Sequence, residues 1–417
     1  MKKIVILGSS PAGVKMIEEV RANGSEDEII LLALDGHYPY KRDAFAPFIA
    51  KDIAPDKVFY QAKDFYEKNN VRVILDKKIS RINVKKRAIF TEDKEQIDYD
   101  ALVVTGAPEN KFPEIKGIHK TGIYGYKKLT DIDQILNVVP LIDTAAIQSD
   151  SFAGLQAAAA LVKRGKEVIF ISSQNDFFSM HFQEDVVQWL VSRLESSNLR
   201  LLRGNTIGEI LGDKDAKAIR IKDGKVISAQ VIIFADCNED LKLFTDTGLQ
   251  INNGIEVNDQ FRTNVDSIFA LDQVSANRNS EPITPTAVLL EQGIAVAAAI
   301  NGQHRSAEIP PVSLSLNVEG LVITVLGQTK PKSDTEIRRT FNKNAGYYKG
   351  LYLENDRLVG AVLINAESEK SNLEWLISEK SLVEPVNPEL PFDEPTSQRH
   401  EVEQIGGQDV STELVDN

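Results

Sequence analysis

Apolar and polar residues follow one another along the chain in an order that predicts alternating strands and helices. The first apolar run, residues 3–7, predicts a buried strand, and residues 14–24 predict an amphipathic helix with apolar side chains at helical spacing. A second apolar run, residues 28–35, predicts a strand that ends on Asp35. The N-terminal segment therefore has the pattern of a strand–helix–strand unit.

The same pattern recurs at residues 145–173, read as an apolar strand, a turn, an alanine-rich helix and a second strand. Phe152, Leu155, Ala158 and Val162 form one face of the predicted helix, which we expect to pack on a sheet. Two such units in one chain predict two nucleotide-type α/β domains with mostly parallel sheets.

The C-terminal part of the chain has a different pattern. Short alternating strands and a helix around Trp375 predict a small α+β domain over residues 304–383. Residues 384–417 are rich in Pro, Glu and Gln and contain few large apolar side chains, so we expect this tail to be disordered.

Composition and charge narrow the class of protein. The chain has 417 residues, 42% hydrophobic and 26% charged, as is usual for a soluble multidomain protein. Its net charge is −13, and residues 384–417 carry nine acidic residues and one arginine, so no nucleic-acid partner is expected. No apolar run reaches the roughly 18 residues of a membrane span. The N-terminus lacks an export signal, so the expected location is cytoplasmic.

Cysteine and histidine usage gives no sign of metal or disulfide chemistry. The one cysteine, Cys237, has no second cysteine with which to form an internal disulfide or a cysteine-based metal site. The five histidines lack ligand spacing. We therefore expect no metal, and we expect Cys237 to be a small buried residue.

Seven short motifs support a resemblance to a known family. In chain order they read GSSPAG, YKR, YDALVVTGAPE, FAGLQAAAALVKRGKEV, EILGD, RTNVDSIFA and EQGIAVAAAING. In this order the chain resembles the FAD/NAD-dependent pyridine nucleotide-disulfide oxidoreductases. The branch that it most resembles contains the rubredoxin and ferredoxin reductases and the flavin portion of nitrite reductases.

The resemblance implies an α/β fold with two Rossmann-like dinucleotide-binding domains, the first interrupted by the second, plus a small C-terminal α+β domain. The expected domains are residues 1–108 with 247–303 for FAD, 109–246 for NAD in degenerate form, 304–383 as an interface domain, and 384–417 as an acidic tail.

The resemblance also implies where FAD would lie. A glycine-containing turn lets backbone amides approach a diphosphate, and an acid after the second strand holds ribose hydroxyls. Ser10 takes the place of the middle glycine of the turn, and either Asp272 or Gln273 takes the place of the acid beside the ribityl chain. The expected FAD contacts are Gly8, Ser10, Pro11, Ala12, Gly13, Asp35, Arg42, Thr105, Gly106, and Asp272 or Gln273.

The second turn departs further from the family pattern. Ser149 and Ser151 replace its first two glycines, and only Gly154 remains. Asp150 places a carboxylate where it would repel a diphosphate. The following strand ends on Ser172, where an acid would bind ribose.

Asp236 and Cys237 stand where the family has another glycine-bearing turn. Together with the second turn, these departures predict that NAD(P)H does not bind by the family's mode.

Two further positions concern the redox chemistry. The resemblance places Pro47 where relatives have a lysine, and Gln156 where they have its glutamate partner. Losing both charges together avoids one uncompensated buried charge. We therefore expect that the usual hydride transfer from nicotinamide to flavin is absent.

These observations lead to one main hypothesis and two alternatives. The main hypothesis is an FAD-dependent oxidoreductase-like flavoprotein whose NAD(P)H site is impaired. This flavoprotein would exchange electrons with a protein partner or a small substrate. The first alternative is a redox-inactive binding or scaffold subunit, and the second is an NAD(P)H-dependent reductase with a rearranged nucleotide site. The expected partner is an electron-transfer protein or a paralogous reductase subunit, in a homo- or hetero-oligomer.

Overall fold

The computed structural model describes residues 1–75, 77–175, 182–195, 198–276, 283–308, 310–318 and 320–382. Met1–Leu382 forms one compact unit. The predicted disorder of residues 384–417 lies outside the described residues. In the described part of the chain, no helix is both long and apolar enough to cross a membrane.

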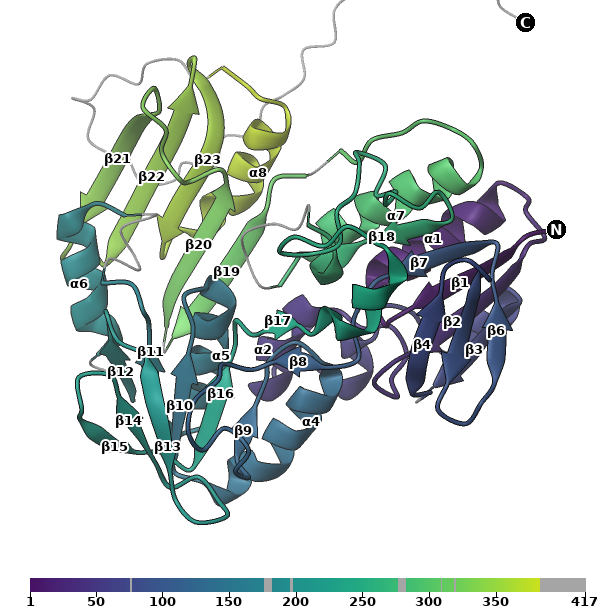
Figure 1. Ribbon diagram of the computed structural model, residues 1–417. Coiled ribbons are helices and arrows are strands. Elements are labelled where there is room, and N and C mark those ends of the chain that lie inside the picture. The colour runs from purple at the N-terminus through teal and green to yellow at the C-terminus, as the bar shows by residue number, and fades with distance from the viewer. Residues whose placement is uncertain are drawn as a thin grey trace, which may run out of the picture. The chain divides into compact units, whose positions relative to one another are not determined.

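The first sheet is parallel and has the strand order β18-β7-β1-β2-β3. Because β18 comes from much later in the sequence, two separate stretches of the chain build this sheet (Figure 1). Its strands are β1 (Lys3–Leu7), β2 (Glu28–Ala33), β3 (Val71–Leu75), β7 (Ala101–Val104) and β18 (Ile268–Ala270).

Both faces of the first sheet are covered, which explains why its strands are almost continuously apolar. Ile4 and Ile6 of β1 face the helices α1 (Pro11–Ala22) and α7 (Thr286–Ile300) in one apolar core. Val5 and Leu7 face the other way, toward a small antiparallel sheet. That sheet consists of β4 (Ile79–Asn83), β5 (Ala88–Thr91) and β6 (Gln96–Asp98).

Helices α1 and α7 pack closely against each other, and Gly293 permits the contact. A Cβ atom at Gly293 would lie 2.4 Å from the carbonyl oxygen of Ala12 and 2.9 Å from the Cβ atom of Lys15. The backbone of α7 therefore supports the first turn of α1.

The second sheet is also parallel, with the order β12-β11-β10-β16-β9. The predicted helix face of Phe152, Leu155, Ala158 and Val162 is buried in one core with the strands, as the periodicity indicates. The strands and helices here are β9 (Ile123–Tyr124), β10 (Thr144–Gln148), α5 (Phe152–Lys163), β11 (Glu167–Ile171), α6 (Glu184–Leu194), β12 (Leu199–Leu202) and β16 (Val231–Phe234). The opposite face is covered by the antiparallel strands β13 (Ile207–Leu211), β14 (Ala218–Ile221) and β15 (Val226–Ser228).

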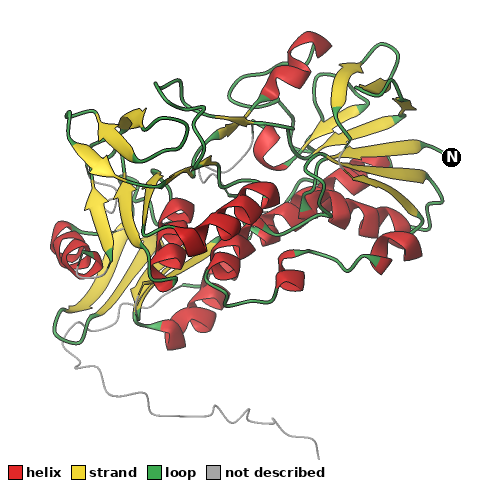
Figure 2. Ribbon diagram, turned by 90° about the horizontal axis from the view of Figure 1, so that it is seen from below, coloured by secondary structure: helices red, strands yellow, loops and turns green. Residues whose placement is uncertain are grey.

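The third sheet is antiparallel, with the order β19-β20-β23-β22-β21. Its buried face shares an apolar core with α5 and α6. Figure 2 shows the strands in yellow and the helices in red. The elements are β19 (Ser313–Val318), β20 (Leu321–Gly327), β21 (Glu336–Asn342), β22 (Tyr347–Glu354), β23 (Arg357–Ile364) and α8 (Lys370–Ser378). The predicted fold class, with two Rossmann-like sheets and a C-terminal sheet domain, is confirmed.

The remaining elements of the described residues are helices, short strands and 3-10 turns. They are α2 (Phe45–Ile49), α3 (Asp64–Lys68), β8 (Asn110–Lys111), α4 (Leu129–Val138), β17 (Asn238–Glu239) and the 3-10 turns at Arg42–Ala44, Pro55–Val58, Val139–Leu141, Leu241–Thr247, Asp272–Val274 and Glu367–Glu369.

Candidate functional site

The turn between β1 and α1 is closed by a contact that only glycine allows. Gly8 has φ +118°, in the region that favours glycine, and a Cβ atom there would lie 2.7 Å from Thr105 Oγ1. The same Cβ atom would lie 2.8 Å from the backbone nitrogen of Gly106. Three of the predicted residues therefore meet at the carboxyl ends of β1 and β7.

Helix α1 begins with a cap supplied by Ser10. Its Oγ atom accepts a hydrogen bond from the Ala12 amide at 3.3 Å, and Pro11 is the first helical residue. Gly13 packs the helix on the sheet, because a Cβ atom there would lie 2.8 Å from Ile6 Cγ2. The amino end of α1, with its positive partial charge, therefore lies beside the Gly8 turn.

A buried set of charged and amide groups adjoins this helix end. We call it the front cluster: Arg42, Lys127, Glu239, Asp272 and Gln273, all at most 7% exposed.

Arg42 is the centre of the front cluster. Its Nη1 donates to Asp272 Oδ2 at 2.9 Å, and its Nη2 lies 3.7 Å from Glu239 Oε1. Its Nε donates to the carbonyl oxygen of Lys127 at 2.9 Å, and Lys127 Nζ lies 3.5 Å from Gln273 Oε1. Two cations and two carboxylates are thus held together out of water.

Opposing effects act on the charge of Arg42. Burial lowers the pKa of the guanidinium, but the nearby Asp272, Tyr40 and Glu239 raise it, and the net pKa lies above the ordinary value. Arg42 therefore stays charged throughout the physiological pH range.

Asp272 and Gln273, which the sequence left as alternatives, have different hydrogen-bond partners. Asp272 Oδ2 accepts from Ser10 Oγ at 2.8 Å as well as from Arg42, so its carboxylate lies at the amino end of α1. Gln273 instead donates its amide to Thr284 Oγ1 at 2.7 Å. The backbone of Asp272 has φ +57°, a conformation that aspartate tolerates better than most residues.

Two carboxylate oxygens of the front cluster have unused acceptor capacity. Asp272 Oδ1 and Glu239 Oε1 are buried, and neither has a hydrogen-bond partner among the described residues. A buried acceptor without a donor is costly, and a ligand hydroxyl would satisfy it. The front cluster therefore fits a polyhydroxylated ligand.

Asp35 lies two residues past the end of β2. Its Oδ1 accepts from Ser9 Oγ at 3.1 Å and its Oδ2 from the Tyr40 hydroxyl at 2.6 Å. Burial, followed by the charge of Asp35, raises the pKa of Tyr40 well above its ordinary value, so this donor keeps its proton. The carboxylate is held in place at the same end of the sheet as the Gly8 turn.

Sequence reasoning missed two members of the front cluster. Lys127 precedes α4, and Glu239 lies in β17, where its Oε2 accepts from the Ala107 amide at 3.1 Å. Neither belongs to a motif that we recognised. The lysine pair at 127–128 in an otherwise apolar approach to a helix is the one signal that was available.

The turn between β10 and α5 is joined by its own side chains. Ser149 Oγ and Ser151 Oγ each donate to Asp236 Oδ1, at 2.7 Å and 2.6 Å. The Asp150 amide donates to the other oxygen of Asp236. Gly154 remains necessary, because a Cβ atom there would lie 2.1 Å from Ser149 Oγ.

The side chain of Asp150 is directed away from its own turn. Its carboxylate accepts from Ser172 Oγ at 2.7 Å and from the Ser173 amide at 2.8 Å, at the carboxyl end of β11. The carboxylate that lies within the turn is therefore that of Asp236. The sequence indicated only that Asp236 stands where the family has another glycine-bearing turn.

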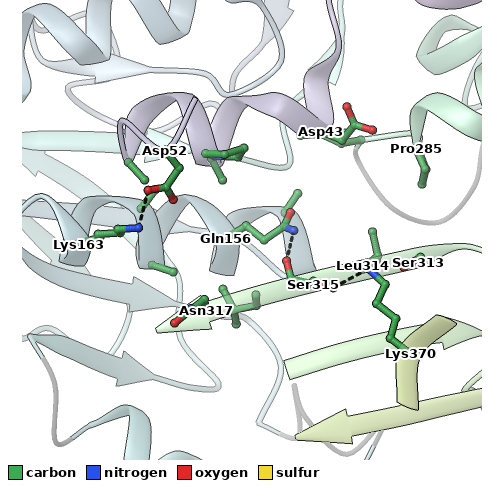
Figure 3. Close-up of a pocket in the computed structure, with 18 residues that line it drawn as sticks. Asp43, Asp52, Gln156, Lys163, Pro285, Ser313, Leu314, Ser315, Asn317 and Lys370 are labelled. Atoms are coloured by element: carbon green, nitrogen blue, oxygen red, sulfur yellow. Dashed lines mark hydrogen bonds and ion pairs between the residues drawn. The ribbon is translucent and has the colours of Figure 1, made fainter. Parts of the chain in front are cut away.

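Pro47 and Gln156 line one cavity of about 420 Å³, together with residues of β19 (Figure 3). Figure 3 shows the amide of Gln156 directed toward β19, where its Nε2 donates to the carbonyl oxygen of Ser315 at 2.6 Å. The two uncharged replacements are thus close in space. Burial raises the pKa of Cys237 to about 12, so its thiol is a poor nucleophile at neutral pH.

Two family profiles match the chain. The one described as pyridine nucleotide-disulphide oxidoreductase matches residues 2–289, well over half of the chain. The one described as rubredoxin NAD+ reductase C-terminal domain matches residues 311–381.

Individual proteins resemble the chain at modest identity. The assimilatory nitrate reductase electron transfer subunit of Bacillus subtilis is 26% identical, over 92% of this chain and 51% of that protein. The rubredoxin-NAD(+) reductase of Ectopseudomonas oleovorans is 23% identical, over 87% of this chain and 95% of that protein. The chain thus spans about half the length of the first relative and nearly all of the second.

Among solved structures, the covalent putidaredoxin reductase–putidaredoxin complex superimposes with a TM-score of 0.79 at 18% identity. The superposition covers 92% of this chain and 94% of the other. At this identity the likeness establishes the fold alone.

Proposed function

The chain belongs to the pyridine nucleotide-disulphide oxidoreductase family, and from this premise we propose that it is an FAD-dependent oxidoreductase that exchanges electrons with a protein partner. We further propose that its second nucleotide site does not accept NAD(P)H by the family's mode. Bound FAD would supply the redox chemistry, and the protein would supply position and electrostatics.

The observation that carries the proposal is the unsatisfied buried oxygen of Asp272. This oxygen, Oδ1, belongs to the carboxylate whose Oδ2 accepts from Ser10 and Arg42 at the amino end of α1, where the helix and the cation favour negatively charged ligand groups. FAD presents an anionic diphosphate, and its ribityl chain also carries hydroxyls that a buried carboxylate oxygen can accept from. Asp272 would accept from a ribityl hydroxyl, and Gly8 would let the backbone approach the diphosphate.

Other residues complete this assignment. Asp35, held by Ser9 and Tyr40, would accept from the hydroxyls of the adenosine ribose. Arg42 and Lys127 would place buried positive charge near the diphosphate, in addition to balancing the carboxylates of the front cluster.

An electron-transfer protein is the partner that the relatives' names favour. The curated relatives include an electron transfer subunit and a rubredoxin reductase, and the superimposed structure is a reductase joined to its redoxin. We propose a small redox protein of this class as the partner.

Retention of FAD by an Asp272→Ala variant tests the proposal. Removing a charge-assisted hydrogen bond worth roughly 1.5–3 kcal/mol lowers FAD affinity by about ten- to a hundredfold. Affinity is measured by fluorescence titration of the full chain, with circular dichroism to verify folding. The isosteric Asp272→Asn variant is expected to lose less.

Asp100→Ala is the matched control, because Asp100 accepts from the Lys3 amide at 2.7 Å at the opposite end of the same sheet. Its FAD affinity is expected to equal that of the unmodified chain. Equal affinity in the Asp272 and Asp100 variants would refute the assignment of Asp272.

A second candidate function follows from the cavity that Pro47 and Gln156 line. Neither side chain is charged, and a site that passes electrons to or from a flavin usually holds groups that stabilise developing charge. On this alternative the chain is a redox-inactive subunit that binds an active partner. Purified protein that remains colourless after incubation with FAD favours this candidate.

A further inference from the structure

The amino end of α5 is built like an anion-binding turn, and it already holds an anion of the protein. Backbone amides and hydroxyls at a helix start commonly receive a phosphate. Here three such donors, the Asp150 amide and the hydroxyls of Ser149 and Ser151, all point to the carboxylate of Asp236. The carboxylate makes the contacts that a phosphate oxygen would make.

The sheet topology explains how Asp236 reaches this turn. Its strand β16 pairs in parallel with β10, so both strands end at the same edge of the sheet. Asp236 follows the end of β16 by two residues, and the turn follows β10 directly. A residue at this position lies across from the helix start whatever its identity, and aspartate adds a carboxylate of the right length.

The charge balance at this turn opposes a second anion. In the described part of the chain, the partners of Asp236 and Asp150 are hydroxyls and amides, with no lysine or arginine among them. At the amino end of α1, by contrast, Asp272 is paired with Arg42 at 2.9 Å. An incoming diphosphate would therefore meet a balanced cluster at α1, and at α5 the carboxylate of Asp236 without a cation to neutralise it.

We propose that Asp236 is the residue that excludes dinucleotides from the second site, because its carboxylate occupies the position that a ligand diphosphate would need. The inference rests on the proposed function and deepens it, since it assigns the loss of nicotinamide nucleotide binding to one side chain. The serines act as positioning residues that hold this carboxylate.

Direct binding of NADH to the full-length chain tests the inference. The proteins compared are the unmodified chain, Asp236→Ala, Asp236→Asn and Asp240→Ala, each titrated with NADH by isothermal calorimetry after circular dichroism has verified folding. Asp240 is the matched control, because it lies four residues further on and caps a different turn through the Lys242 amide.

The expected result is a gain of binding. Asp236→Ala empties the position, and NADH affinity rises at least about tenfold over the unmodified chain. Asp236→Asn removes the charge but keeps an acceptor oxygen, so its gain is smaller. Asp240→Ala leaves NADH affinity unchanged.

Two other outcomes refute the inference, and they differ in what they mean for the proposed function. If neither the unmodified chain nor the folded Asp236 variants bind NADH measurably, Asp236 is not the excluding residue, and the proposed impairment stands. If the unmodified chain itself binds NADH measurably and Asp236→Ala binds it no more tightly, both the inference and the proposed impairment of the second site are wrong.

Discussion

At the scale of single residues, the two helix starts differ in how a carboxylate is balanced. Asp272 shares its charge with Arg42, whereas Asp236 relies on Ser149, Ser151 and one backbone amide. Charge-assisted hydrogen bonds to neutral donors lower the cost of a buried carboxylate without removing it. Because no lysine or arginine is among the hydrogen-bond partners of Asp236 in the described part of the chain, its ionisation should change the free energy of unfolding.

Asp236 is expected to make stability depend on pH. Burial raises the pKa of Asp236 above its ordinary 3.8. An acid with a raised pKa in the folded state stabilises the fold below its ordinary pKa, and this contribution is lost as the pH rises through the raised value. The free energy of unfolding of the unmodified chain, minus that of Asp236→Asn, should therefore fall as the pH rises from about 3.8. Urea unfolding across this range measures the difference.

Asp185 provides a control of opposite sign. The hydrogen bond from Arg339 lowers the pKa of Asp185, so its contribution is present above the ordinary pKa and is lost as the pH falls. The corresponding difference for Asp185→Asn should rise with pH. Parallel slopes for the two variants would contradict the assignment for Asp236.

The sequence could predict part of the site at this scale. Gly8, Ser10 and Arg42 stand in motifs whose spacing already suggests a role, and the structure brings them to one helix end. Lys127 and Glu239 belong to no such motif, because their places depend on loops from distant parts of the chain. The direction of the Asp150 side chain could not be predicted from the sequence either, because its hydrogen bonds with Ser172 and Ser173 determine it.

At the scale of elements, the contact between α1 and α7 positions the front cluster. Helical spacing predicted α1, but it could not indicate that the backbone of α7 meets the first turn of α1 at Gly293. The addition of β18 to the first sheet was likewise implied only by the family resemblance, because strand order depends on pairing between distant segments. Local patterns predict elements better than they predict their neighbours.

Gly293→Ala should destabilise the protein, although alanine favours an exposed helix by about 1 kcal/mol over glycine. The added Cβ atom would meet the Ala12 carbonyl oxygen at 2.4 Å, and backbone cannot move aside cheaply. Overpacking of this kind costs roughly 1–3 kcal/mol, measurable by urea unfolding. Gly208→Ala is the control, because its nearest neighbour lies at 3.5 Å and its stability should change little. Equal stability of the two variants would argue against the close contact.

At the scale of the whole molecule, two helix starts of similar design have different charge environments. One lies beside a cluster with buried cations and an unsatisfied acceptor oxygen, and the other is joined to a carboxylate of its own chain. On the proposed function, the first site takes a flavin dinucleotide, and the second turn excludes another dinucleotide. Electrons would then have to enter or leave through a protein partner or a small substrate.

The most direct test is an anaerobic spectrophotometric titration of the purified, FAD-loaded chain with NADH. We expect about one flavin bound per chain, with an oxidised absorption that persists after NADH is added. A chain that retains no flavin, or a bound flavin that NADH bleaches rapidly, would refute this expectation.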